Sequence, residues 1–353
     1  LSKELTEREA HLFAVKDALM FNYAGSPDNQ GQTYYMAPNA DYGATFTYYL
    51  KEAPKSKKAE RQEAEKKLFK EGKPIPQPGW RDLELEAMEE SAHLIFTIRD
   101  EKGNIVRQFN RAPSKGISRV TWDLRYSMPT ITRVTGRFNP VESGGGGGRR
   151  GGIAVMPGTY SVEMELWEKG EVKKLAGPVK FTAKKLNNVT LPASDYNENV
   201  AFAREVSTLA VAMVGTDHLT GELISKVEHI KQAIYSTPEA GKEMMNKARQ
   251  AARELEEIRF ALNGLAAKAS QEEVPPAPVP LNTRLGNIVN AHIGNSAGIT
   301  PAEKAELSIL KEEFPPLLAR LRQIAEKEIP AIEALLNQLN APWTPGRIPE
   351  YPK

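Results

Sequence analysis

A length of 353 residues allows two or three domains, at roughly 100 to 200 residues for each. Hydrophobic residues make up 40% and charged residues 26% of the chain, which is ordinary for a globular protein. The net charge of +2 is too small to predict a nucleic acid or an anionic membrane as partner. The absence of cysteine excludes disulfides, thiolate metal sites and cysteine nucleophiles. No run approaches about 18 apolar residues, so the sequence predicts no membrane-spanning helix.

Residues 1–42 are interpreted as an N-terminal connector. A short amphipathic segment, 5–15, precedes a polar loop signal at 26–31. Because the chain begins at Leu1 with neither an initiator methionine nor the pattern of a signal peptide, we expect a fragment or a processed product.

Residues 43–186 are predicted to form an immunoglobulin-like β-sandwich. Short segments of alternating apolar and polar residues recur at intervals of roughly 8 to 12 residues, which is typical of antiparallel sandwiches. The predicted strands are 43–50, 94–99, 105–109, 120–124, 160–166 and 179–183. An insertion at 54–90 begins as a solvated helix over 54–72, and the Pro-rich run that follows cannot continue that helix. A Gly-rich loop is expected at 139–152.

Residues 187–340 are predicted to form an antiparallel helical bundle, because the apolar period changes from two to about 3.6. The predicted helices cover about 195–236, 238–263 and 301–339, with a minor segment at 285–292 and a stiff Pro-rich spacer at 275–280. Thr300 and Glu303 form a capping-box signal for the third helix. Prolines 315, 316 and 330 are expected to kink or interrupt it. Residues 341–353 form a Pro-rich tail. The predicted fold class is therefore α+β multidomain.

Several of these segments resemble the C-terminal region of bacterial exported proteins built on a sortilin-like β-propeller with BNR or Asp-box repeats, which are often labelled glycosyl hydrolases. The matching stretches are 12–16, 42–52, 98–100, 103–107, 119–126, 157–162 and 341–350. The sandwich part also resembles the immunoglobulin-like domain of flagellar hook-capping proteins, a pattern that specifies fold more than function.

The resemblance implies an exported accessory module, periplasmic or at the bacterial cell surface, that packs against an upstream propeller or a protein partner. The sequence contains no Asp box of the form Ser-x-Asp-x-Gly-x-Thr-Trp. The hydrolase activity that the family label implies therefore has no matching residues in this chain.

A set of aromatic residues is denser than the chain average and is the candidate binding surface, for a stacked glycan or a protein partner. Its members are Tyr34, Tyr35, Tyr42, Tyr48, Tyr49 and Trp80. Half-burial of these side chains in a sheet is an equally good interpretation.

Asp123 is the best single candidate for a reactive carboxylate, and with Asp100 or Glu101 it could form the acid pair that glycoside hydrolysis needs. The structural interpretation is stronger. In that interpretation Trp122 fills the core, Asp123 caps a turn or pairs with Arg125, and Asp100 closes a hairpin.

The other candidate sites are weak. The run Gly144–Gly148 with its following arginines lacks the P-loop context, so a surface loop is favoured over a phosphate cradle. No two histidines stand at metal-binding spacing with a helical acid, so we expect neither metal nor cofactor. The function predicted is a non-catalytic structural and interaction module. The alternatives are an accessory portion of a glycoside hydrolase whose catalytic domain lies outside this chain, and a carbohydrate-binding module.

Overall fold

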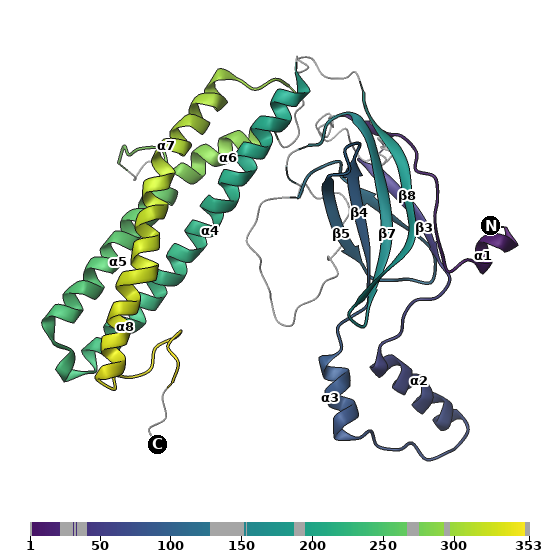
Figure 1. Cartoon of the computed structure of the whole chain (residues 1–353), viewed down its shortest axis with the longest axis horizontal. Helices are drawn as coiled ribbons and strands as arrows, with labels where there is room; N and C mark the ends of the chain where they lie inside the picture. The colour runs from purple at the N-terminus through teal and green to yellow at the C-terminus, as the bar shows by residue number, and fades with distance from the viewer. Residues whose placement is uncertain are drawn as a thin grey trace. The chain divides into compact units, whose positions relative to one another are not determined.

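Figure 1 shows the computed structural model of the chain. The structure describes residues 2–21, 31, 33, 41–127, 152, 154–186, 195–266, 275–292 and 297–349. The described residues separate into two compact units, one that holds the strands and one, from Asp195 onward, that is helical.

The first unit contains two sheets and three helices. The three-stranded sheet has the order β1-β3-β6, and the five-stranded sheet has the order β2-β8-β7-β4-β5. The strands are β1 (Ala10–Leu12), β2 (Ala18–Met20), β3 (Ala44–Leu50), β4 (His93–Asp100), β5 (Ile105–Arg111), β6 (Gly116–Trp122), β7 (Gly158–Glu168) and β8 (Glu171–Lys185). The helices are α1 (Lys3–Glu7), α2 (Lys57–Lys70) and α3 (Trp80–Met88).

Aromatic side chains from both sheets share one core. Phe46 on β3 lies 5.5 Å, between ring centroids, from Phe181 on β8, and Phe96 on β4 lies 5.4 Å from Phe109 on β5. Trp122 meets Phe181 edge-on at 6.1 Å. All five rings are at most 5% exposed, so each sheet buries one face against the other.

Gly43 is required where β3 approaches β6. Its φ is +126°, and a Cβ placed there would lie 1.9 Å from the backbone oxygen of Trp122. No side chain fits that space, so glycine allows the first β3–β6 pair, Ala44 opposite Trp122, to form.

The predicted fold class, an antiparallel immunoglobulin-like sandwich followed by an antiparallel helical bundle, is wrong. The five-stranded sheet is mixed, because β2 pairs in parallel with β8, with Ala18 opposite Ala183. β2 belongs to the segment 1–42 interpreted from the sequence as a connector. One sheet curls as half of a barrel, and a bundle following a sheet is not clearly shown. Alternation in the sequence indicates which face a side chain occupies, but it does not indicate which strands pair or in which direction.

The second unit is built from helices that bury a core of their own. Its elements are α4 (Tyr196–Tyr235), a 3-10 turn (Pro238–Ala240), α5 (Gly241–Asn263), α6 (Leu281–His292), α7 (Pro301–Gln323), a π-helical segment (Ile324–Glu328) and α8 (Ile329–Gln338). Its fully buried side chains include Met213, Ile230, Leu255, Leu310 and Leu336, from four of the helices.

The prolines act differently from one another in the last helices. Pro315 and Pro316 lie inside α7, which continues through them. Their rings free the carbonyls of Lys311 and Glu312, whose side chains are exposed, so water can satisfy these groups. Pro330 is the second residue after the π-helical segment, whose wider turn gives room for its ring.

Within the described residues, none of the helices is both long enough and apolar enough to cross a membrane.

Candidate functional site

The predicted aromatic surface divides into separate places. Tyr34 and Tyr35 lie outside the described residues. Tyr48 points into the core and is 3% exposed. Tyr42 is half-buried against Phe21, with ring centroids 5.2 Å apart.

The other two described members, Tyr49 and Trp80, also lie in different environments. Tyr49 is half-buried and donates its hydroxyl to the backbone oxygen of Thr6 at 3.2 Å. Trp80 is 81% exposed at the first position of α3, about 13 Å along that helix from the end that leads to β4. Of the described members, Trp80 alone presents most of its ring to solvent.

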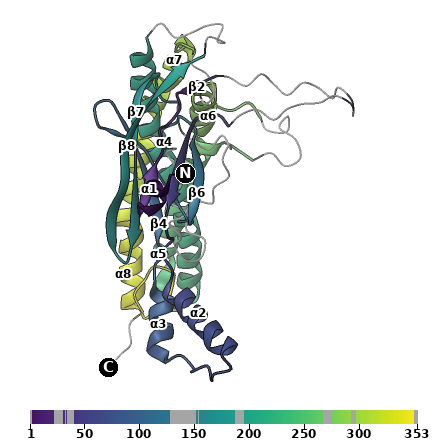
Figure 2. The same cartoon turned by 90° about the vertical axis from the view of Figure 1, so that its right-hand side faces the viewer.

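Trp80 belongs to a helical hairpin, defined here as residues 56–89, that connects β3 to β4. The hairpin projects beyond the ends of the strands in both views (Figures 1 and 2). α2 begins at Ser56, whose hydroxyl accepts a hydrogen bond from the backbone N–H of Ala59 at 3.2 Å, and α3 begins after Gly79. The insertion at 54–90 thus holds a second helix that the sequence did not predict.

Neither helix of the hairpin has a buried residue, and both lie entirely within the described residues. Six large apolar side chains of the hairpin are exposed: Phe69 (75%), Ile75 (47%), Trp80 (81%), Leu83 (38%), Leu85 (36%) and Met88 (57%). Single exposed apolar side chains are common on protein surfaces, but six in one short projecting element make the hairpin the candidate functional site.

The two helices are joined mainly by one arginine. Arg61 on α2 donates to both carboxylate oxygens of Glu86 on α3, at 2.5 and 2.8 Å, and to Glu65 at 2.6 Å. These bonds hold the pKa of Glu86 below its usual range and raise the pKa of Arg61. At the base, the backbone N–H of Lys57 donates to Glu89 at 2.8 Å.

A cleft of about 490 Å³ opens between α2 and α3. Arg61 and Glu86 lie on its polar side, and Leu68, Pro78 and Leu85 supply apolar lining. Neither of the two helices that form the cleft has a buried residue to hold it in place. The shape of the cleft therefore depends on the Arg61–Glu86 pair.

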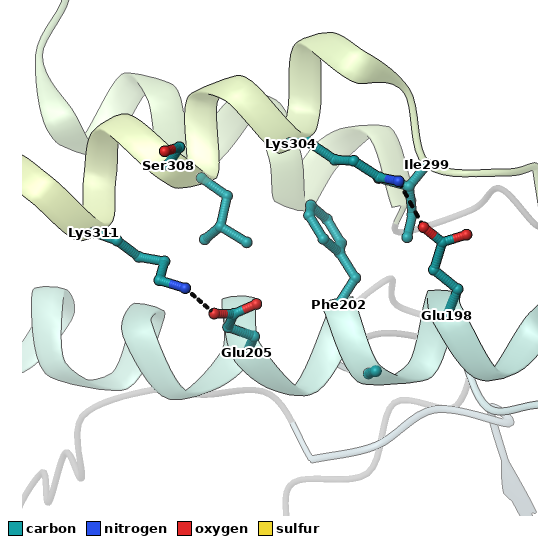
Figure 3. Close-up of a pocket in the computed structure, with 9 residues that line it drawn as sticks. Glu198, Phe202, Glu205, Ile299, Lys304, Ser308 and Lys311 are labelled. Atoms are coloured by element: carbon teal, nitrogen blue, oxygen red, sulfur yellow. Dashed lines mark hydrogen bonds and ion pairs between the residues drawn. The ribbon is translucent and has the colours of Figure 1, made fainter.

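A second hollow, of about 400 Å³, lies between α4 and α7 (Figure 3). Phe202 projects into it, and an ion pair stands on each side. Lys304 contacts Glu198 at 2.6 Å, and Lys311 contacts Glu205 at 2.5 Å. Each carboxylate is paired with a lysine from the facing helix, so these contacts join α4 and α7.

The carboxylates considered for catalysis have structural partners. Asp100 accepts backbone hydrogen bonds from Lys102 and Asn104, both at 2.9 Å, and thereby closes the β4–β5 turn. Glu101 accepts from the backbone N–H of Thr159 at 3.1 Å. The interpretation of Asp100 as a hairpin-closing residue is confirmed by these contacts.

Asp123 is half-buried beside the buried Arg125. Burial raises the pKa of its carboxyl, although the Arg107 and Arg125 guanidinium groups oppose the shift. Among the residues that the structure describes, no group of three His, Asp or Glu side chains is placed to hold a metal ion. The Gly144–Gly148 run lies outside them.

Comparison with known proteins adds no family to this picture. No family model, curated protein or solved structure matches the chain.

The sequence predicted Trp80 as a member of the binding surface, but it did not predict α3, the helix on which Trp80 lies. The signals for α3 were a Gly N-cap position and Asp82 in the first turn, and both were obscured by the preceding Pro-rich run.

Proposed function

We propose that this chain is a non-catalytic interaction module that contacts its partner through the α2–α3 hairpin. The observation that carries the proposal is the exposure of six large apolar side chains on a hairpin whose two helices have no buried residue. Burial of Phe69 or Trp80 by a partner would stabilise the complex by about 2 kcal/mol for each side chain.

The hairpin is also an unusual element to retain without a partner. Isolated helices shorter than about 12 to 15 residues are marginal in water, and most helices gain their stability from an apolar face packed on a core. α2 has 14 residues and α3 has nine, and neither packs such a face. A partner that covered the hairpin would supply the missing core.

The positions of the carboxylates support a non-catalytic role. Asp100 and Glu101 hold backbone N–H groups, as described above, and Asp123 lies beside two arginines. Each has a structural reason for its position.

The sequence resemblance supports an exported protein with a sortilin-like β-propeller as the parent of this module. In that arrangement the propeller is joined to the module through the chain itself. The hairpin would then contact a further partner outside the cytoplasm.

Site-specific photo-crosslinking in the source cells tests the proposal. A photo-reactive phenylalanine derivative replaces Trp80 in the full chain, and a control variant carries it in place of Val172, which is 57% exposed on β8 of the same unit. We expect an adduct from position 80 and little or none from position 172. Equal yields at the two positions, or no adduct at position 80, would contradict the proposal.

A further inference from the structure

The hairpin is strongly polarised in charge. Its outer part, residues 66–81, contains five basic side chains and one acidic side chain, a net charge of +4; we call this stretch the basic tip. The following residues, 82–90, contain five acidic side chains and no basic one. The net charge of +2 for the whole chain therefore conceals a local concentration of positive charge at the end of a projecting element.

Three cations of the basic tip are available to a partner. Lys66, Lys67 and Lys70 are exposed, and none of them makes an ion pair with a described residue. Lys73 pairs with Glu71 at 2.8 Å and Arg81 pairs with Glu84 at 2.6 Å, both on the surface. Exposed pairs of this kind exchange partners at little cost.

The same tip carries the two most exposed apolar side chains of the hairpin, Phe69 and Trp80, together with Ile75. Phe69 lies in the last turn of α2, Ile75 lies in the connection, and Trp80 is the first residue of α3. Indole and phenyl rings between lysines match the chemistry of a lipid interface, where the rings enter the headgroup region and the ammonium groups meet lipid phosphates.

The connection between the helices is stiff. Gly72 turns the chain with φ of +66°, and Pro74, Pro76 and Pro78 each fix a backbone angle. A loop restricted in this way loses little conformational entropy when it binds. Because the tip projects from the unit, as Figure 2 shows, a deformable surface can surround it more readily than a rigid one.

We propose that the basic tip docks on an anionic lipid surface, with Phe69, Ile75 and Trp80 in the interface and Lys66, Lys67 and Lys70 on the lipid phosphates. The inference rests on the proposed function and names the partner of the same hairpin. Charge complementarity selects the lipid, since the acidic residues at the base would keep the rest of the hairpin away from it.

Sedimentation of the full chain with vesicles tests the inference. Vesicles of phosphatidylglycerol and phosphatidylcholine in equal parts are compared with vesicles of phosphatidylcholine alone, at low and high salt. We expect binding to the anionic vesicles that weakens as salt rises. The triple variant Lys66→Ala, Lys67→Ala and Lys70→Ala should lower the partition coefficient about a hundredfold.

The apolar part has its own variant. Phe69→Ala with Trp80→Ala should lower the partition coefficient about tenfold or more, since each ring contributes buried apolar area. In the unsubstituted chain, binding should shift the Trp80 fluorescence to shorter wavelength, and the shift should be lost in Trp80→Phe.

Matched controls come from the β7–β8 hairpin. Lys169 lies in its turn and Lys173 and Lys174 lie on β8; all three are exposed, and each contacts a glutamate. Their triple alanine variant, and Val172→Ala, should bind vesicles as the unsubstituted chain does. Circular dichroism should show that every variant is folded.

Two results would overturn the lipid inference: no binding to anionic vesicles, or equal losses in the tip and control variants. A protein adduct from position 80 in the crosslinking experiment, with no vesicle binding, would reject the lipid and leave the interaction module standing. Failure of both experiments would reject both proposals.

Discussion

The indole Nε1 of Trp122 donates a hydrogen bond to the backbone oxygen of Arg125 at 2.9 Å. This bond closes a bend in which Leu124 has φ of +54° and is fully buried. A second indole of the chain makes the same kind of bond: Trp343 donates to the oxygen of Arg347 at 2.7 Å, but it is 58% exposed.

Trp122→Phe should reduce the free energy of unfolding by about 2 kcal/mol, because it removes the indole hydrogen bond to the Arg125 carbonyl and opens a small cavity in the core. Trp343→Phe should cost less than about 1 kcal/mol, since water replaces the lost donor. Urea denaturation of the two full-length variants measures both values. Equal losses would show that the Trp122 bond has no special role in the bend.

Asp123 should make stability depend on pH. Because burial raises its folded-state pKa, the folded protein holds this proton more tightly than the unfolded chain. Its contribution is therefore fully present below the unfolded-state pKa of about 4 and is lost as pH rises through the folded-state pKa.

The Asp123→Asn variant cannot titrate at this position. The unsubstituted chain should lose stability relative to this variant as pH rises from about 4 to 7. The free energy of unfolding of Asp123→Asn minus that of the unsubstituted chain should therefore increase over this range. Urea titrations across that range give the difference. A decrease in that difference as pH rises would mean that Arg107 and Arg125 outweigh burial and lower the folded-state pKa of Asp123.

Glu86→Gln should loosen the hairpin without unfolding the sheets. The substitution removes the charge that Arg61 contacts through two bonds, so the backbone amides of α2 and α3 should exchange faster with deuterium. Glu84→Gln is the control, because its exposed pair with Arg81 joins neighbours on one helix. Unchanged exchange in Glu86→Gln would show that other contacts hold the helices together.

Thr300→Ala should destabilise the helical unit by about 1 kcal/mol. Its hydroxyl accepts from the Glu303 N–H at 3.3 Å, while the Glu303 carboxylate accepts from the Thr300 N–H at 2.6 Å. Ser308→Ala, an exposed change later in α7, should have little effect on the urea midpoint. A loss no larger than that of Ser308→Ala would count against the cap.

The sequence predicted features that depend on neighbouring residues. The structure confirms the capping box of Thr300 and Glu303. The sequence could predict it because the signal for this helix start lies within four residues. The observed α4, Tyr196–Tyr235, lies within one residue at each end of the helix expected at about 195–236, since its apolar stripe is long and regular.

Features that depend on distant residues were missed. Ala18 and Ala183 are far apart in the sequence, and nothing in their local pattern indicates a parallel pair. Tyr48 and Tyr49 are adjacent in the chain, yet β3 sends one into the core and the other toward Thr6, so an aromatic count could not predict a surface.

Thiol accessibility at position 77 in intact source cells tests the docking role of the hairpin most directly. Gln77 is exposed in the connection between α2 and α3, and its replacement keeps Phe69, Ile75 and Trp80 in place. The chain has no cysteine, so Gln77→Cys and the control Lys169→Cys each introduce a single thiol. Alkylation by a small, membrane-permeant maleimide is timed in cells and on the purified protein. We expect the thiol of Gln77→Cys to react at least about tenfold more slowly in cells, corresponding to about 1.4 kcal/mol of protection, with Lys169→Cys unchanged. Equal slowing at both positions, or none at position 77, would contradict the account.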